Sequence, residues 1–259
     1  MRLTTLGDLI LDVIVSLGGP LVAGDDRPAA IKAGAGGQAA NVAAWAQALG
    51  AEARLVCRRG SDAAGELAAR ELSAKGVEIC GPNGGSGGVV VSLAAAGDRT
   101  MASDRGEAKA LEPADLDEAW FACDVLHVSG YALHGGPIAA AAAEAARLAR
   151  AHGATISVDL STFTLADGDF AARVRALAPD LVFANEREHD TLGAIDARLV
   201  LKRGASGIVV DGTEYDAVPT SVVDATGAGD ALAAGFLVGG PALGLEAAAR
   251  CCAKLGAMP

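Results

Sequence analysis

Short apolar segments alternate with longer segments of helical composition from residue 38 to the end of the chain. Helices are predicted for residues 38–49, 63–75, 137–152 and 170–177, and a glycine, common at helix ends, follows the first three. Strands are predicted between them, at residues 54–57, 77–80, 124–128, 155–159 and 181–183. This order predicts an α/β fold in which a mostly parallel sheet is flanked by helices on both faces.

Two regions interrupt the alternation and have strand-like patterns without a convincing helix. In residues 9–33 the apolar segments are separated by glycine and proline, and residues 84–104 read as a hairpin that turns at Gly97 and Asp98. We expect both regions to form a small sheet that covers the main site as a lid. The whole chain, residues 1–259, is then a single domain carrying this lid.

Composition narrows the range of partners. The net charge is −11 and only 3% of the residues are aromatic, so the chain lacks the basic and stacking surfaces that nucleic acids and anionic membranes require. The five cysteines are scattered without metal-ligand spacing, which indicates free thiols in a reducing compartment. We therefore expect a cytoplasmic protein with a small-molecule partner, without nucleic acid or membrane.

The most informative segment is VVDATGAGDALAAGF, residues 222–236. An apolar pair leads into a glycine-rich turn and then into a helical run, so the pattern predicts a strand end, a tight turn and a helix start. The first amides of a helix lack intrahelical partners and attract anions, and Gly227 and Gly229 let a phosphate approach them closely. Asp230 would repel that phosphate unless it accepts the proton of an attacking hydroxyl. The other interpretation is an ordinary turn whose acid is favoured by the helix dipole.

Strand-to-helix turns in such sheets lie at the carboxyl ends of the strands, where ligands bind. Asp230 and Asn185 both occupy predicted turns of this kind. A second glycine cluster, at Gly36 and Gly37, opens a helix in which Asn41 can donate and accept hydrogen bonds toward a polyhydroxylated molecule. By itself this second motif is equally compatible with a plain helix entry.

Together the two motifs resemble the signature regions of the ribokinase-like (PfkB) carbohydrate kinase family. The resemblance spans nearly the whole chain, from GDLILD through GGQAANVAAWAQALGA, RRGSDAAG, NERE and KRGASG to DATGAGD. It implies a Rossmann-type three-layer fold and ATP-dependent phosphorylation of a hydroxyl group on a sugar or sugar-like molecule. It also implies ATP and Mg²⁺ as cofactors and is compatible with a monovalent cation, K⁺, near DATGAGD.

The resemblance assigns roles by position. Asp230 matches the catalytic base, and the amides of Gly227, Ala228 and Gly229 match the anion hole. The positions that match substrate-binding residues are Asp12, Gly36, Gly37 and Asn41. The positions implied on the nucleotide side are Asn185, Lys202, Gly204, Gly207 and Thr226, with Glu188 linked indirectly to magnesium.

Several of these residues have a structural alternative. Asn185 and Glu188 have the spacing of a helix capping box, and Gly204 and Gly207 could simply shape a hairpin. Asp12 is also compatible with a solvated acid at a strand end. Arg105 either reaches over the substrate from the lid or is an ordinary exposed arginine.

The chain also departs from the family pattern. Ile10 stands where ribokinases tend to have an asparagine that faces ribose, which argues against strict ribose specificity. Ala225 stands where many members of the family carry Thr, Ser, Pro or Val. The segment between Glu188 and Leu199 is short, which suggests a trimmed flank of the nucleotide pocket.

Three rival functions follow from the same residues. A nucleoside kinase of the family would place an apolar Ile10 beneath a base or ribose, and a non-catalytic binder would keep the anion cradle without turnover. A dinucleotide-dependent oxidoreductase would need a GxGxxG turn after the first strand, which the 34–37 cluster does not provide.

An exposed edge of the lid would allow pairing into a homodimer.

Overall fold

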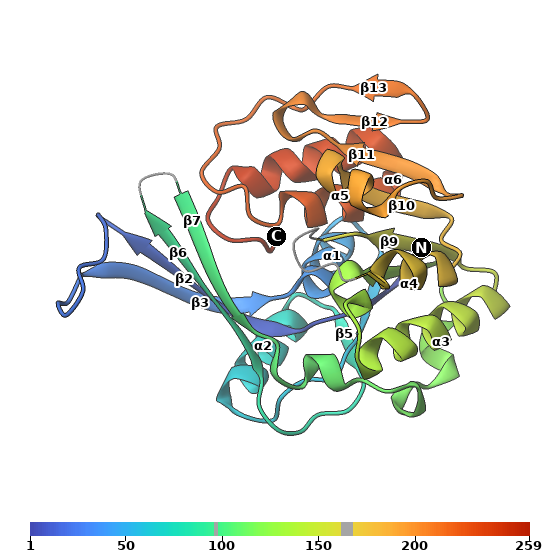
Figure 1. Cartoon of the computed structure of the whole chain (residues 1–259), viewed down its shortest axis with the longest axis horizontal. Coiled ribbons are helices and arrows are strands. Elements are labelled where there is room, and N and C mark those ends of the chain that lie inside the picture. Colours follow the sequence, from blue (N-terminus) through green and yellow to red (C-terminus); the bar gives the residue numbers. More distant parts are fainter. Residues whose placement is uncertain (96–97, 162–167) are drawn as a thin grey trace.

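The computed structural model describes residues 1–95, 98–161 and 168–259. Two sheets organise this part of the chain (Figure 1), a nine-stranded one in the order β13-β12-β11-β10-β9-β8-β1-β4-β5 and a four-stranded one in the order β3-β2-β6-β7. The strands of the large sheet are β1 (Arg2–Leu6), β4 (Glu52–Val56), β5 (Glu78–Cys80), β8 (Val125–Ser129), β9 (Thr155–Asp159), β10 (Leu181–Asn185), β11 (Arg198–Lys202), β12 (Ile208–Val210) and β13 (Thr213–Tyr215).

Seven strands of the large sheet, from β5 to β11, pair in parallel, and β12 and β13 close one edge as antiparallel strands. The predicted α/β class is confirmed. The pattern missed β1, which lies at the centre of the sheet between β8 and β4. The segment is short and ends at Gly7 and Asp8, so its burial within the sheet was not visible from the sequence.

Helices cover both faces of the large sheet, as expected for parallel strands. One hydrophobic cluster joins the sheet to α1 (Gln38–Ala48), α2 (Ala63–Ala74) and α6 (Ala228–Cys252). The other joins it to α3 (Pro137–Ala151), α4 (Phe170–Ala176) and α5 (Glu186–Leu192). Short 3₁₀ helices lie at η1 (Gly106–Ala110), η2 (Pro113–Asp115), η3 (Glu118–Phe121), η4 (Gly130–Leu133) and η5 (Gly204–Ser206).

Helix α6 is long and apolar enough to pass a length-and-composition test for a membrane span. It is nevertheless a helix of the core, because it packs on α1 and contributes buried residues to the first cluster. Its backbone is also non-helical at Gly239 and Gly240, just before Pro241. A proline inside a helix removes a backbone hydrogen bond, which accounts for the kink.

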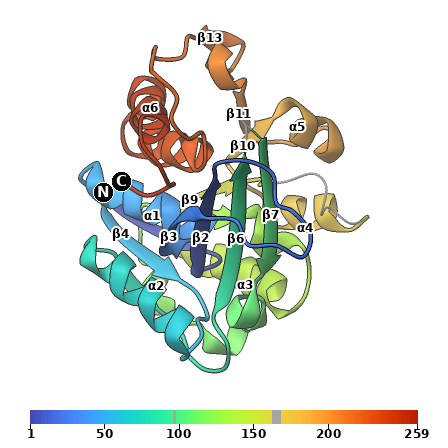
Figure 2. The same ribbon diagram turned by 90° about the vertical axis from the view of Figure 1, so that its left-hand side faces the viewer.

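The small sheet consists of β2 (Ile10–Leu17), β3 (Ala29–Gly36), β6 (Gly88–Ala95) and β7 (Asp98–Asp104). Both regions with strand-like patterns therefore form one sheet, as predicted. It projects from one side of the molecule (Figure 1), and Figure 2 shows it from that side, with α1 and α2 beside it. Gly97, which was predicted to be in the hairpin turn, lies outside the described residues, and Asp98 is the first residue of β7.

Candidate active site at the turn before helix α6

The glycine-rich turn differs from its predicted form on one side. Val222 and Val223 are not the end of a strand; they are 65% and 63% exposed, and Val223 N–H donates to Cys252 O at the end of α6. The predicted strand end is therefore wrong. In the described part of the chain, the apolar pair does not pair with a strand of either sheet and lies beside the last turn of α6. The turn and the helix start are confirmed, with Gly227 as the N-cap and Ala228 as the first helical residue.

Local contacts hold this turn in one conformation. Gly227 has a left-handed φ of 76°, and a Cβ there would collide with Ala257. The C-terminal segment that contains Ala257 is itself fixed, since its carbonyl oxygen accepts from Trp45 Nε1 at 2.8 Å. Asp224 accepts hydrogen bonds from Thr226 N and Gly256 N at 2.9 and 3.0 Å. The free amides of the helix start are thus positioned before any ligand binds.

A cavity of about 550 Å³ opens on one side of the turn, between the large and the small sheet. It is bordered by the GAGD turn, by α1 and by the small sheet, and we call it the acceptor-side cavity. Its lining residues are Asp8, Ile10, Asp12, Gly37, Gln38, Asn41, Val90, Met101, Ser103, Arg105, Tyr131, His134, Ser161, Thr226, Gly227 and Asp230. The structure therefore brings together Asp12, Gly37, Asn41 and Asp230, which are separated by up to 218 residues in the sequence.

Asp230 lies in the first turn of α6 and accepts a hydrogen bond from Asn41 Nδ2 at 2.8 Å. Its pKa is raised to about 7: burial is the main cause, the charge of Asp159 also raises the pKa, and the Asn41 hydrogen bond lowers it. A carboxyl with this pKa is a much better proton acceptor near neutral pH than an exposed aspartate. Within the described chain, the buried Asn41 Oδ1 has no hydrogen-bond partner, and Asn41 is one of the residues that line the cavity.

Asp12 does not lie at the carboxyl end of a strand. It lies within β2, its side chain lines the acceptor-side cavity, and a Cβ on Gly36 would overlap its carboxylate. The close approach of the Asp12 side chain thus leaves no room for a side chain at Gly36. Gly37 caps the N-terminus of α1 and lines the cavity directly.

Asp8 and Arg105 form an ion pair that the sequence did not suggest. The guanidinium donates from Nε and Nη2 to both oxygens of the buried Asp8 carboxylate, each at 2.6 Å. Arg105 is therefore held over the cavity at the end of β7 and is not an ordinary exposed arginine. Asp8 belongs to GDLILD, and the presence of two acids in that motif could have indicated a second role.

A second cavity of about 550 Å³ lies on the other side of the turn, and we call it the donor-side cavity. Gly204 and Gly207 line it together with Ala228 and Gly229. Apolar side chains from α6 and the preceding segment make up much of the remaining wall: Val218, Val222, Leu232, Leu245, Ala248 and Ala249. Gly204 and Gly207 also lie in the hairpin that joins β11 to β12, so the hairpin interpretation holds as well.

Asn185 and Glu188 form the capping box that was left open as an alternative. Asn185 Oδ1 accepts from Glu188 N at 2.9 Å, and Glu188 Oε2 accepts from Asn185 N at 2.8 Å. Burial raises the pKa of the Glu188 carboxyl, while the charge of Lys202 lowers it. Asn185 and Lys202 line a neighbouring groove of about 430 Å³ that also contains Gly204. Thr226, in contrast, lines the acceptor-side cavity and not the donor-side one.

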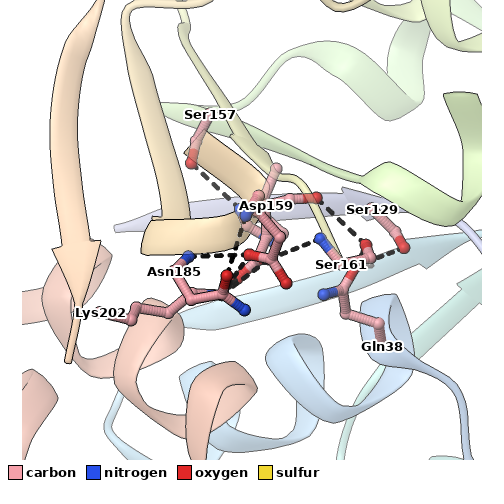
Figure 3. A network of polar contacts seen from close by, with 9 residues as sticks. Gln38, Ser129, Ser157, Asp159, Ser161, Asn185 and Lys202 are labelled. Atoms are coloured by element: carbon pink, nitrogen blue, oxygen red, sulfur yellow. Dashed lines mark hydrogen bonds and ion pairs between the residues drawn. The ribbon is translucent and has the colours of Figure 1, made fainter. Parts of the chain in front are cut away.

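A polar network extends from Lys202 toward the acceptor-side cavity (Figure 3). Lys202 Nζ donates to both oxygens of Asp159 at 2.8 and 2.9 Å, and Asp159 Oδ1 accepts from Ser161 N at 3.0 Å. Ser161 Oγ and Ser129 Oγ both donate to Gln38 Oε1 at 2.5 Å. Sequence reasoning missed Asp159, Ser161 and Gln38, although Asp159 ends a predicted strand where ligands are expected.

Comparisons with known proteins agree with this arrangement. The family model described as pfkB family carbohydrate kinase matches residues 2–258. An ATP-dependent ribose-1-phosphate kinase from Halopiger xanaduensis is 32% identical over 221 residues, which cover 78% of this chain and 72% of the relative.

Solved structures are similar over the full length. Adenosine kinase from Sinorhizobium meliloti is 27% identical with a TM-score of 0.86, covering 100% of this chain and 95% of the other. A structure from E. coli assigned as ribokinase II, in complex with ATP and Mg²⁺, is 22% identical with a TM-score of 0.80, covering 99% and 94%. The second likeness concerns the fold alone. The family predicted from the two signature motifs is therefore confirmed, and the chain belongs to the pfkB family of carbohydrate kinases.

Proposed function

We propose that the protein phosphorylates a hydroxyl group of a sugar or sugar-like small molecule with ATP as the donor. One observation carries this proposal: Asp230, with its raised pKa, lies at a turn between two cavities, one lined by several charged side chains and the other with a largely apolar wall. A phosphoryl transferase needs its base on the acceptor side and its anion hole between the two substrates. The GAGD turn supplies both within four residues.

The chemistry assigned to this site begins with Asp230, whose carboxylate accepts the hydroxyl proton while the oxygen attacks the γ-phosphorus. Even with a pKa of about 7, a carboxylate is too weak to remove the proton from an alcohol beforehand, so proton transfer accompanies P–O bond formation. The amides of Gly227, Ala228 and Gly229 are assigned to the negative charge that develops on the phosphoryl oxygens. Asp12 and the Asn41 carbonyl oxygen are assigned to the other hydroxyl groups of the acceptor.

The donor-side cavity suits a nucleotide. Its apolar wall can hold a base, while Gly204 and Gly207 leave room for the backbone to approach the phosphates. We assign Asn185 and Lys202 to the phosphate end of the nucleotide. Thr226 is the weakest member of this set, since it faces the acceptor-side cavity.

Magnesium is compatible with the residues at the phosphate end. Asp159 and Glu188 place two carboxyls against the single ammonium of Lys202, at 2.8 and 3.8 Å, so the cluster has an excess of acid that a divalent cation would balance. Among the described residues no group of three metal-ligating side chains exists. This suits Mg²⁺, which usually keeps waters and phosphate oxygens as ligands. When bound, Mg²⁺ neutralises charge on the β- and γ-phosphates, and Glu188 would hold it through water.

A monovalent cation, K⁺, is the finer part of the cofactor proposal. Asp224 contributes the carboxylate of the glycine-rich turn, and its oxygens already accept from Thr226 and Gly256. A cation bound at Asp224 would therefore find the loop already in its bound conformation. Turnover measured in K⁺, Na⁺ and tetramethylammonium chloride at equal ionic strength tests this: equal rates would remove the cation from the proposal.

We also propose that the chain is one kinase domain and that its small sheet, formed by the segments around 9–33 and 84–104, acts as a lid. The inner face of this sheet carries Ile10, Asp12 and Val90 into the acceptor-side cavity. Strand alternation then directs Val13, Val15 and Val91 to the outer face. Since Ile31, the cross-strand neighbour of Val15, is 66% exposed, this face is a surface on which two copies could pair as a homodimer.

Light scattering over a dilution series tests the dimer. We expect dimers in the wild type and monomers in Val15→Asp, while the exposed polar change Asp26→Asn leaves the mass unchanged. Monomers at every wild-type concentration would contradict it. Free thiols at all five cysteines are consistent with the cytoplasm as the compartment.

The acceptor distinguishes the remaining candidates. The apolar Ile10 and Val90 in the cavity wall favour a nucleoside as the second candidate, and the cited relatives are named for ribose 1-phosphate and adenosine. ADP release should therefore be measured with ribose, other sugars, ribose 1-phosphate and adenosine, beside nucleotide binding alone. Turnover of a sugar or sugar phosphate supports the proposal, while turnover of adenosine alone supports the nucleoside kinase. Nucleotide binding without ADP release from any acceptor would indicate a non-catalytic binder.

A further inference from the structure

One largely buried cation lies beside the anion hole, and so far it has been assigned only to the phosphate end of the nucleotide, without a role in the transfer step. Lys202 is at the carboxyl end of β11, and its side chain is 17% exposed. Burial lowers the pKa of its ammonium, but the charges of Asp159 and Glu188 outweigh burial, so the pKa is raised overall. Lys202 is therefore positively charged throughout the physiological pH range.

The ammonium is close to the helix start that forms the anion hole. A Cβ built on Gly229 would stand 3.7 Å from Lys202 Nζ, and both residues line the donor-side cavity. The N-terminus of a helix carries partial positive charge, so a cation at this place is unfavourable. The arrangement becomes favourable when an anion lies between the ammonium and the amides of Ala228 and Gly229.

The hydrogen bonds from Lys202 to Asp159 do not require all of the N–H groups of the ammonium. An ammonium has three N–H groups, and two of them suffice for the hydrogen bonds to Asp159 Oδ1 and Oδ2. Glu188 Oε2, at 3.8 Å, is within ion-pair range but too far for a hydrogen bond. Asp159 is 1% exposed and is itself fixed by Ser161, so it holds the ammonium in one position (Figure 3).

The backbone conformation of Ser161 indicates that this network has a function. Its backbone is in the left-handed region, at φ 71°, although it is not a glycine. Such conformations cost energy and occur preferentially at active sites, where surrounding contacts hold them. Here the contacts are the hydrogen bonds of Ser161 to Asp159 and Gln38.

We propose that Lys202 is a catalytic residue, whose ammonium contacts an oxygen of the transferring phosphoryl group opposite the amides of the GAGD turn, and that Asp159 is its positioning residue. This proposal rests on the proposed function. In the step, the bond from the γ-phosphorus to the β-γ bridging oxygen breaks and the bond to the acceptor oxygen forms. The hydroxyl proton goes to Asp230, ADP leaves with the bond electrons, and Lys202 keeps its protons while it balances the developing charge.

Substitution of the lysine tests the proposal with a matched set of variants. Lys202→Met should lower kcat by roughly 10²-fold to 10³-fold with acceptor KM changed by less than about threefold. Lys202→Arg should recover part of the loss because it keeps the charge. The double variant Lys202→Met/Asp159→Asn leaves no unpaired buried acid at 159, so it should unfold at nearly the wild-type temperature yet stay as slow as Lys202→Met. The exposed Lys109→Met is the control.

A binding readout separates this proposal from the proposed function. Lys202→Met should lose about tenfold in affinity for β,γ-imido-ATP and keep its affinity for ADP, because only the former carries the γ-phosphate. This comparison needs no acceptor, so it tests Lys202 even if no acceptor in the panel is turned over. A folded double variant with near wild-type kcat, or equal losses for both nucleotides in Lys202→Met, would overturn the proposal.

Discussion

The two cavities on either side of the GAGD turn have similar volumes and different walls. On the acceptor side, an ion pair holds Asp8 and Arg105, and a hydrogen bond from Asn41 holds Asp230. On the donor side, the charged group that lines the cavity is Lys202, and apolar residues make up much of the wall. Fixed charges recognise a particular pattern of hydroxyl groups, whereas an apolar slot accepts a base by shape. Specificity is therefore expected to lie in the acceptor-side cavity.

The largest effect is expected where the two cavities meet. Asp230→Asn should lower kcat by roughly 10²-fold to 10⁴-fold with little change in either KM, because the amide keeps the shape and cannot accept the proton. The measurement is steady-state ADP release, with the exposed Asp190→Asn as control. Near wild-type turnover in Asp230→Asn would remove the base from this residue.

A change on the acceptor side should affect one substrate alone. Asp12→Asn should lower kcat/KM for the acceptor by roughly 10-fold to 10²-fold, because it weakens charge-assisted hydrogen bonds to hydroxyl groups. Nucleotide KM should stay within about twofold of wild type. The exposed Asp26→Asn, in the loop of the same sheet, provides the comparison; equal effects on both substrates would contradict separate recognition.

The matching change on the donor side is Ala249→Phe. A phenyl group there should fill part of the apolar slot and raise nucleotide KM about tenfold, with acceptor KM unchanged. Ala242→Phe, at an exposed position of the same helix, should leave both constants unchanged. A rise in acceptor KM in Ala249→Phe would show that the two cavities do not act separately.

The smallest expected effect is a shift in pH dependence. With an Asp230 pKa of about 7, kcat/KM should rise with pH through about 7, because the base acts only when deprotonated. Asn41→Ala removes a hydrogen bond that favours the charged form, so the acid limb should move to higher pH. Asp12→Asn removes a neighbouring negative charge, so the limb should move to lower pH, each by up to about one unit. Shifts of the same sign in both variants would contradict the assignment of the limb to Asp230.

Several sequence-based predictions depended on local patterns, and those were accurate. The glycine after each of three helices and the apolar strands gave the α/β class and most elements of the large sheet. Local patterns were insufficient where burial decides the structure. The segment of β1 is short and is followed by Gly7 and Asp8, so it was not predicted as a strand, whereas the exposed pair Val222–Val223 was predicted as the end of one. Whether an apolar segment becomes a strand depends on a neighbour in the sheet.

The amino-acid sequence by itself determined the family and the residues of the phosphate cradle, because the glycines of DATGAGD and the helix start that supplies the amides are adjacent in the sequence. Tertiary structure alone decided which groups contact those residues and what pKa Asp230 has. It brought Asn41 to Asp230, Arg105 to Asp8 and Asp159 to Lys202, over separations of 189, 97 and 43 residues. Burial and charge within these contacts set the pKa of Asp230, and neither can be read from sequence spacing, since both depend on which distant groups the fold places within a few ångströms.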